Sequence, residues 1–139
     1  MTSTPPPHAL VDANVLLRLF TGKPTAQAQA AHALMARADV GEVLLHVCPL
    51  VVAEVVWVLT SAYEQPVSAV CRVFTDFLAS GGLVVEEGVQ VTTALRDMDR
   101  LGVDFVDGYL AARAGLGALP VASFDNDFDR LGAERLPLS

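Results

Sequence analysis

Lysine is almost missing from this sequence, and basic residues as a whole are few. Lys23 is the only lysine, and nine Lys and Arg side chains stand against 16 Asp and Glu, which gives a formal net charge of −7. A chain of this charge lacks the broad basic surface that binds nucleic acid without specificity. That exclusion weakens if bound divalent cations neutralise several of the carboxylates.

Cysteine is also scarce, and the motifs of several enzyme classes are missing. Cys48 and Cys71 lie in separate apolar segments, so we expect two small core side chains in a reducing cytosol and no disulfide. The sequence has no zinc-ligand spacing, no glycine-rich phosphate loop, and no Ser or Cys nucleophile with a partnering His. These absences exclude zinc sites, P-loop chemistry and Ser or Cys hydrolases.

No stretch has the length of a membrane span. The longest apolar run, 47–60, is interrupted by Glu54 and is shorter than a transmembrane helix needs. The N-terminus has neither a basic region nor an apolar core of the signal-peptide kind. We therefore predict a soluble, cytoplasmic protein that does not contact a membrane.

The 139 residues suit one domain, which we place at 9–139 after a short extended arm at 1–8 that contains three consecutive prolines. Hydrophobic residues make up 53% of the chain and charged residues 18%, which is more apolar than a lone globule requires. This composition favours a homodimer or a chain with an obligate partner.

Strand and helix patterns alternate along the chain. Apolar runs predict strands that end at Asp12, at 42–47, 83–86 and 119–123, with a possible edge strand at 134–138. Helical spacing predicts helices at 13–20, 24–38, 49–63, 67–80, 89–101 and 105–114. The pattern predicts the α/β class: a three-layer α/β/α sandwich with a mostly parallel four- or five-stranded sheet. We expect the first strand to be central and covered on both faces.

Four acids stand out by their positions: Asp12, Glu54, Asp107 and Asp125. Asp12 and Asp125 follow strands, where open α/β sheets build their sites, although Asp12 also suits a plain helix N-cap. Glu54 lies in a helix that is apolar almost all round, so we expect it to be buried and either paired with a distant arginine, protonated or bound to a cation.

Asp107 lies in the first turn of a predicted helix that Asp104 can cap, and both positions favour the helix electrostatically. If the four acids converge at one edge of the sheet, their charges repel unless cations intervene. Mg²⁺ or Mn²⁺ takes oxygen ligands and leaves room for a phosphate, so phosphodiester hydrolysis suits these residues best. An aspartyl-phosphate mechanism at Asp12 suits them less, because no lysine serves the site.

The order of four motifs resembles the PIN domain family, and within it the VapC-like toxins of bacterial toxin–antitoxin pairs. The motifs are VDANVLLRLF, PLVVAEVVWVL, DFVDGYLAARA and VASFDNDFDRL, and the resemblance spans residues 10–131. The resemblance implies a Mg²⁺- or Mn²⁺-dependent endoribonuclease that forms a homodimer, acts on RNA and is inhibited by a cognate antitoxin protein. Alternatives on the same fold are an RNA-processing nuclease without an antitoxin and a non-catalytic assembly module.

The resemblance also implies roles for individual residues. The acidic quartet of the family corresponds to Asp12, Glu54, Asp107 and Asp125, as metal ligands and catalytic residues. The supporting positions correspond to Asn14, Asp104, Ser123 and Asp127. Asp127 is an alternative fourth acid, since the spacing of the last motif varies in the family. Arg18, Arg113 and Arg130 are the candidates for phosphate contacts.

Overall fold

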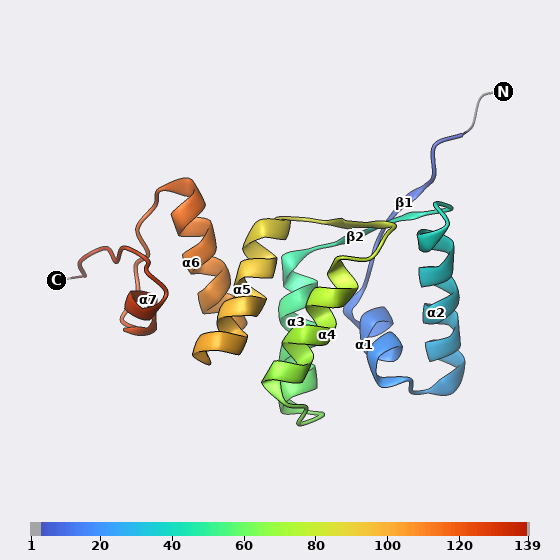
Figure 1. The fold of residues 1–139 in the computed structure, drawn as a ribbon, viewed down its shortest axis with the longest axis horizontal. Helices are drawn as coiled ribbons and strands as arrows, with labels where there is room; N and C mark the ends of the chain where they lie inside the picture. The colour runs from blue at the N-terminus through green and yellow to red at the C-terminus, as the bar shows by residue number, and fades with distance from the viewer. Residues whose placement is uncertain (1–3, 139) are drawn as a thin grey trace. The chain divides into compact units, whose positions relative to one another are not determined.

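The computed structural model of the protein describes residues 4–138, which form three strands and seven helices (Figure 1). The elements in chain order are β1 His8–Leu10, α1 Ala13–Thr21, α2 Thr25–Asp39, β2 Leu44–Val47, α3 Pro49–Ser61, α4 Val67–Leu78, β3 Leu83–Val85, α5 Gly88–Leu101, α6 Phe105–Gly117 and α7 Asp127–Arg130. The strands pair in parallel in the order β1-β2-β3. The predicted α/β class is confirmed, and the elements are consistent with a three-layer α/β/α arrangement.

The described chain divides into two compact units. The first contains residues 4–65 and 76–86, and so holds the sheet with α1, α2 and α3. The second contains residues 66–75 and 87–138, with α5, α6 and α7, while α4 contributes residues to both. The predicted domain at 9–139 and arm at 1–8 stay predictions, and the parts of them at residues 1–3 and 139 lie outside the described residues.

In the first unit, β2 is the middle strand and β1 lies at the edge of the sheet. Leu45 and Val47 of β2 are 1% and 0% exposed, whereas all three residues of β1 are exposed. The expectation of a central, covered first strand is therefore wrong. Only β2 has a hydrogen-bonded neighbour on each side, and a run of three residues is too short for its composition to report burial.

The strand β1 leads directly into α1, whose amphipathic pattern buries Leu16 and Leu17. Asp12 occupies the N-cap position with an extended backbone, but its side chain makes no capping hydrogen bond. Gly22 ends the helix in the left-handed conformation, with φ 72°, and its N–H donates to the carbonyl of Arg18. Asp12 thus begins the helix through its backbone, and its carboxylate is not used as a cap.

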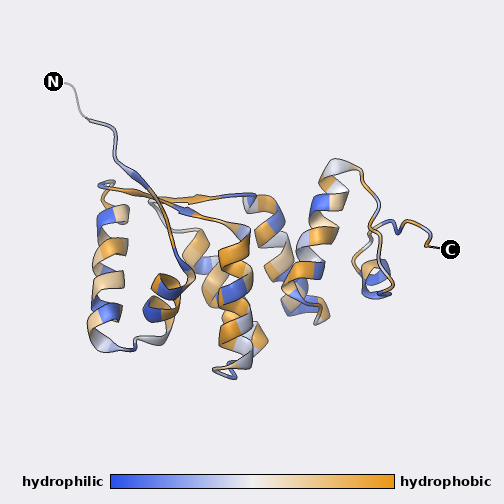
Figure 2. Ribbon diagram, turned by 180° about the vertical axis from the view of Figure 1, so that it is seen from behind, coloured by the Kyte–Doolittle hydropathy of each residue, from blue (hydrophilic) through white to orange (hydrophobic). Residues whose placement is uncertain are grey.

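The helix α3 is hydrophobic along nearly its whole length, yet it has an exposed face (Figure 2). Val52, Val55 and Val56 are buried, whereas Leu50 and Trp57 are 80% and 68% exposed. Glu54 is exposed as well, so the expectation that it is buried is wrong. Residues 50, 54 and 57 share one face at helical spacing, and the buried valines occupy another.

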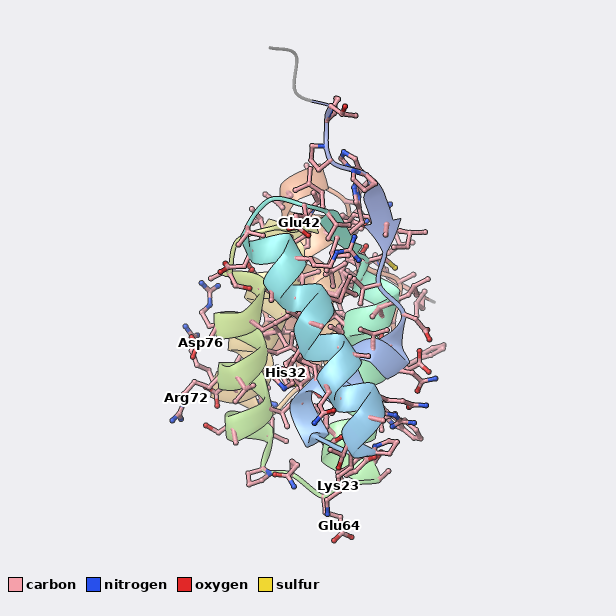
Figure 3. The ribbon with its side chains drawn as sticks, turned by 90° about the vertical axis from the view of Figure 1, so that its right-hand side faces the viewer. Lys23, His32, Glu42, Glu64, Arg72 and Asp76 are labelled. Atoms are coloured by element: carbon pink, nitrogen blue, oxygen red, sulfur yellow. The ribbon has the colours of Figure 1, made fainter. Side chains whose placement is uncertain are left out.

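The exposed surfaces of α2 and α4 carry polar side chains together with small or apolar ones, such as Ala30 of α2 and Val73 of α4. His32 and Arg37 of α2 are exposed, and Arg72 and Asp76 project outward from α4 (Figure 3). Cys48 is half-buried, Cys71 is buried, and both are free thiols, which confirms the prediction of no disulfide. None of the described helices is long and apolar enough to cross a membrane.

In the second unit, α5 and α6 pack closely where Gly108 of α6 approaches Ala94 of α5, and Val91, Leu95 and Met98 of α5 are buried. The segments predicted as fourth and fifth strands meet only at one parallel bridge, between Val121 and Arg135. Pro120 and Pro137 flank that bridge, and proline supplies no N–H for a longer ladder. The acidic segment after Val121 contains the short helix α7.

Candidate metal centre

Three carboxylates of the second unit come together. Asp107, Asp125 and Asp127 each present an oxygen, and these oxygens all lie within 4.8 Å of one another. Asp107 lies in the first turn of α6, Asp125 in the loop before α7, and Asp127 is the first residue of α7. Asp107 and Asp127 are half-buried and Asp125 is exposed. We call these three residues the acidic cluster.

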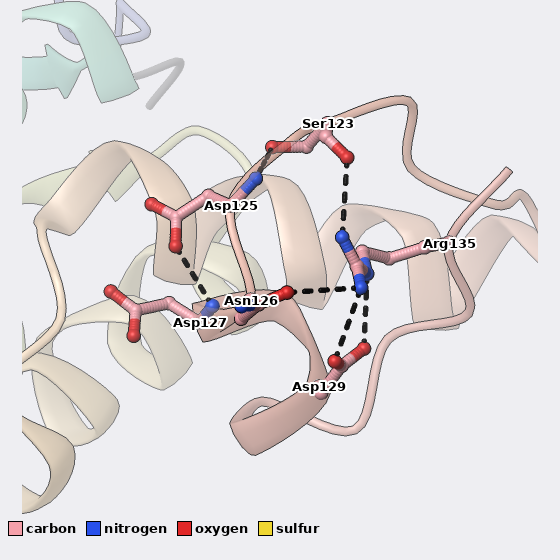
Figure 4. A network of polar contacts seen from close by, with 6 residues as sticks. All are labelled: Ser123, Asp125, Asn126, Asp127, Asp129 and Arg135. Atoms are coloured by element: carbon pink, nitrogen blue, oxygen red, sulfur yellow. Dashed lines mark hydrogen bonds and ion pairs between the residues drawn. The ribbon is translucent and has the colours of Figure 1, made fainter. Parts of the chain in front are cut away.

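Local hydrogen bonds fix the loop that carries two of the three acids (Figure 4). The Asp125 N–H donates to Ser123 Oγ at 2.9 Å, and the Asp127 N–H donates to Asp125 Oδ1 at 2.8 Å. Short polar side chains that bond to a backbone two residues away form tight turns of this kind.

Arg135 ties the same loop to the C-terminal segment (Figure 4). Its Nε and Nη2 donate to the two carboxylate oxygens of Asp129 at 3.1 and 3.3 Å, and Nη2 also donates to Asn126 Oδ1 at 3.2 Å. Its Nη1 donates to the Ser123 carbonyl at 3.4 Å. A planar guanidinium suits this forked pairing, so Arg135 holds both ends of the acidic loop.

Arg130 holds the other side of the cluster. Its Nη1 donates to Asp127 Oδ1 at 3.1 Å, and its Nη2 donates to the carbonyl of Leu101 at the end of α5. Sequence reasoning named Arg130 as a phosphate contact. In the structure its side chain instead links the acidic loop to α5.

The charges of the cluster are not balanced by these arginines. Burial raises the pKa of Asp107, and the charges of Asp104, Asp125 and Asp127 raise it further. The ionised cluster therefore contains like charges that repel one another across a short distance. A divalent cation between the carboxylates would relieve that repulsion.

The donor set fits a hard divalent cation. All three groups are carboxylates, and within residues 4–138 no His or Cys joins them as a ligand. Oxygen ligands suit Mg²⁺, Mn²⁺ or Ca²⁺, whereas zinc sites are built from nitrogen and sulfur. Mg²⁺ usually binds few carboxylates and keeps several waters, which is what three partly exposed acids can offer.

The other predicted site residues lie in different places. Asp104 precedes α6 as its N-cap, again without a capping hydrogen bond from its side chain. Asp12 and Glu54 belong to the first unit, as the N-cap residue of α1 and an exposed residue of α3. Asn14 lines a hollow of about 330 Å³ together with residues of α1 and α2. Convergence of the whole quartet stays a prediction.

Sequence reasoning missed Arg135 and the extent to which α7 depends on it. No motif marks Arg135, which lies 12 residues after Ser123 and outside the four motifs. The only available signal was the weak strand pattern at both ends of the bridge between Val121 and Arg135. A side chain that bonds across such a distance can be placed only once the chain is folded.

Comparison with known proteins gives one family match. The sequence profile of the PIN domain matches residues 9–134, which is nearly the whole chain and includes every acid discussed above. Searches of curated proteins and of solved structures gave no match.

Proposed function

The chain belongs to the PIN domain family, and from that premise we propose that it is a Mg²⁺- or Mn²⁺-dependent endoribonuclease that hydrolyses RNA phosphodiester bonds. PIN domains are commonly metal-dependent nucleases. One observation carries the proposal for this chain: the oxygens of Asp107, Asp125 and Asp127 lie within 4.8 Å of one another. Such a cluster is unfavourable without a cation, and it fits the metal that the family typically uses.

The proposed roles follow from where each residue lies. Asp107, Asp125 and Asp127 would hold the cation, and Asp12 would act with Asp107 as a ligand of the principal metal. Glu54, whose side chain is exposed on α3, would orient the attacking water. A bound Mg²⁺ or Mn²⁺ would activate water and stabilise the charge that develops on the phosphate.

The remaining residues of the site have supporting roles in this proposal. Ser123 positions the Asp125 backbone through the bond to its N–H, and Asp104 adds negative charge beside Asp107. Arg18 and Arg113 remain candidates for phosphate contacts, although Arg18 donates to Gln27 at 2.7 Å in this structure. An RNA strand would displace that exposed bond at little cost.

We further propose that the protein is the cytoplasmic toxin of a toxin–antitoxin pair and that it works as a homodimer with a cognate antitoxin. The order of the four motifs supports the toxin subtype, and the exposed Leu50 and Trp57 on one face of α3 support association with another protein surface. A single-chain mass at every concentration in light scattering would contradict the dimer. Survival of cells that express the chain without a partner would contradict toxicity.

The central experiment is cleavage of a structured RNA by the purified chain with Mg²⁺, with Mn²⁺ and with EDTA. We expect cleavage only with a metal. Asp12→Asn and Asp107→Asn should each lower the rate by roughly 100-fold or more, because each removes a proposed ligand of the metal that activates water and stabilises the developing charge. Asp76→Asn is the matched control, since Asp76 is exposed on α4.

Two outcomes would count against the proposal. Cleavage that persists in EDTA would exclude metal dependence. Full activity in Asp107→Asn, with circular dichroism equal to that of the unchanged protein, would exclude the acidic cluster as the site.

A further inference from the structure

Phe124 is the most exposed large hydrophobic residue beside the acidic cluster. Its side chain is 90% exposed, and it lies between Ser123, which bonds to the loop, and Asp125 of the cluster. Burying a phenylalanine removes a large apolar area from water. Packing within the described chain therefore does not explain why this position carries phenylalanine.

The backbone on both sides of Phe124 is held in place. The Ser123 carbonyl accepts a hydrogen bond from Arg135, and Ser123 Oγ accepts one from the Asp125 N–H. Arg135 is itself anchored on Asp129 by two hydrogen bonds. A fixed backbone presents the ring at a defined place and lowers the entropic cost of binding against it.

Phe124 also forms one wall of a pocket. The pocket has a volume of about 420 Å³ and is lined by Ser123, Phe124, Arg135, Leu136, Pro137 and Leu138. Pockets of roughly 300 to 1,000 Å³ hold small organic groups. The apolar walls suit the flat faces of an aromatic ring, while the Ser123 and Arg135 groups suit polar atoms at its edge.

We propose that Phe124 and this pocket bind an unpaired nucleobase of the RNA substrate next to the bond that is cleaved. The inference rests on the proposed nuclease function, and it assigns Phe124 and the pocket to contact with a base of the substrate. Aromatic side chains stack on unpaired bases, whereas the bases of an A-form duplex are already stacked on one another. Phe124 is a specificity-determining residue in this account, because it contacts substrate beside the reacting phosphate.

Fluorescence of a tryptophan placed at the pocket tests the proposal without requiring cleavage. Trp57 is the only tryptophan, so the combined variant Trp57→Phe, Phe124→Trp, Asp107→Asn carries one indole at the pocket and leaves RNA intact. We expect quenching on addition of a single-stranded 12-nucleotide RNA with Mg²⁺, and much less quenching by the same strand with abasic sites. The matched control carries Leu116→Trp in place of Phe124→Trp, because Leu116 is exposed on α6 outside the pocket.

Kinetics of otherwise unchanged protein provide the second test. Phe124→Ala should weaken RNA binding by roughly 5- to 100-fold, which is the range found when a stacking side chain is truncated. The weaker binding should appear mainly as a higher KM, whereas Phe124→Trp should have the KM of the unchanged protein. The melting temperature of Phe124→Ala should stay unchanged, since the ring is exposed.

The outcomes separate this proposal from the proposed function. Cleavage with an unaltered KM in Phe124→Ala, or equal quenching at positions 116 and 124, would overturn the base pocket and leave the nuclease standing. Quenching confined to position 124, together with no RNA cleavage by the unchanged chain, would support the pocket and reject the nuclease. Absence of quenching at position 124 would overturn the pocket.

Discussion

Asp107 shows how one residue can serve the helix and the proposed site together. In the first turn of α6 its negative charge favours the helix dipole, which was visible in the sequence. The structure adds that burial and three neighbouring acids raise its pKa. The position was predictable because strand ends and helix starts have sequence signals, whereas its proximity to both Asp125 and Asp127 needed the folded loop.

Cys71 gives a prediction at the same scale. Burial, with a smaller contribution from the charge of Asp99, raises the pKa of this thiol from 9.0 to about 11. Between these two pH values the unfolded chain loses the thiol proton while the folded chain keeps it. This contribution to stability is thus fully present below pH 9 and is lost as the pH rises through about 11.

The measurement is chemical denaturation from pH 8 to 11, run beside Cys71→Ala. The unchanged protein should lose stability more steeply with pH than the variant does. Thiol titration with a disulfide reagent at pH 8 should show one reactive group, Cys48, because Cys71 is 2% exposed. Equal slopes for the two proteins, or rapid reaction of both thiols in folded protein, would contradict the assignment.

Among the elements, α7 and the loop before it depend most on contacts that are distant in sequence. The four residues of α7 are too few to form a stable helix alone, and Arg135 and Arg130 supply the hydrogen bonds that hold them. The longer helices behave differently. The helices α1 and α2 begin and end within two residues of the sequence prediction, because capping residues and apolar spacing are local signals.

Removal of the Arg135 side chain tests this dependence. Arg135→Ala should cost about 1 kcal/mol of unfolding free energy, as expected for a few partly exposed hydrogen bonds. It should also accelerate hydrogen exchange at the amides of Asp125 and Asp127, which are protected in the turn. The Gly108 amide in α6 serves as the internal reference, since it bonds to the Asp104 carbonyl.

Two comparisons make that result specific. Arg135→Lys keeps the charge but not the forked geometry. Hydrogen exchange at the loop amides of this variant should therefore be faster than in the unchanged protein and slower than in Arg135→Ala. Arg96→Ala removes the exposed Arg96 side chain from its ion pair with Asp97 at 3.8 Å and should leave the loop amides unchanged. Unaltered exchange at Asp125 in Arg135→Ala would show that the loop is held by its own turn alone.

For the sheet and α3, the sequence predicted correctly which segments form strands and a helix, but it did not predict which of their residues are buried. The parallel order of the strands follows from alternating strands and helices. The edge position of β1, and the exposure of Glu54 and Trp57 on α3, did not follow. Hydrophobicity reports a preference for burial, but it does not say which apolar face is covered within the same chain and which is left for a partner.

For the whole molecule, the charge balance links the fold to the proposed chemistry. With 16 acidic and 9 basic side chains, the chain repels a polyanion unless cations lie between them. Three of the acids form a cluster that burial and mutual repulsion make unfavourable. The same cation would then stabilise the acidic cluster and admit the RNA phosphate, which makes metal binding the central claim.

The most direct test is titration of the metal-free protein with Mn²⁺, followed by electron paramagnetic resonance of the free ion, without any RNA present. We expect saturable binding to the unchanged chain. Affinity should fall by roughly 10- to 100-fold in Asp107→Asn and in Asp125→Asn, in keeping with the loss of a group that holds or orients a metal. Asp76→Asn should bind as the unchanged protein does. Equal affinity in all four proteins, or no saturable binding in the unchanged chain, would contradict the account.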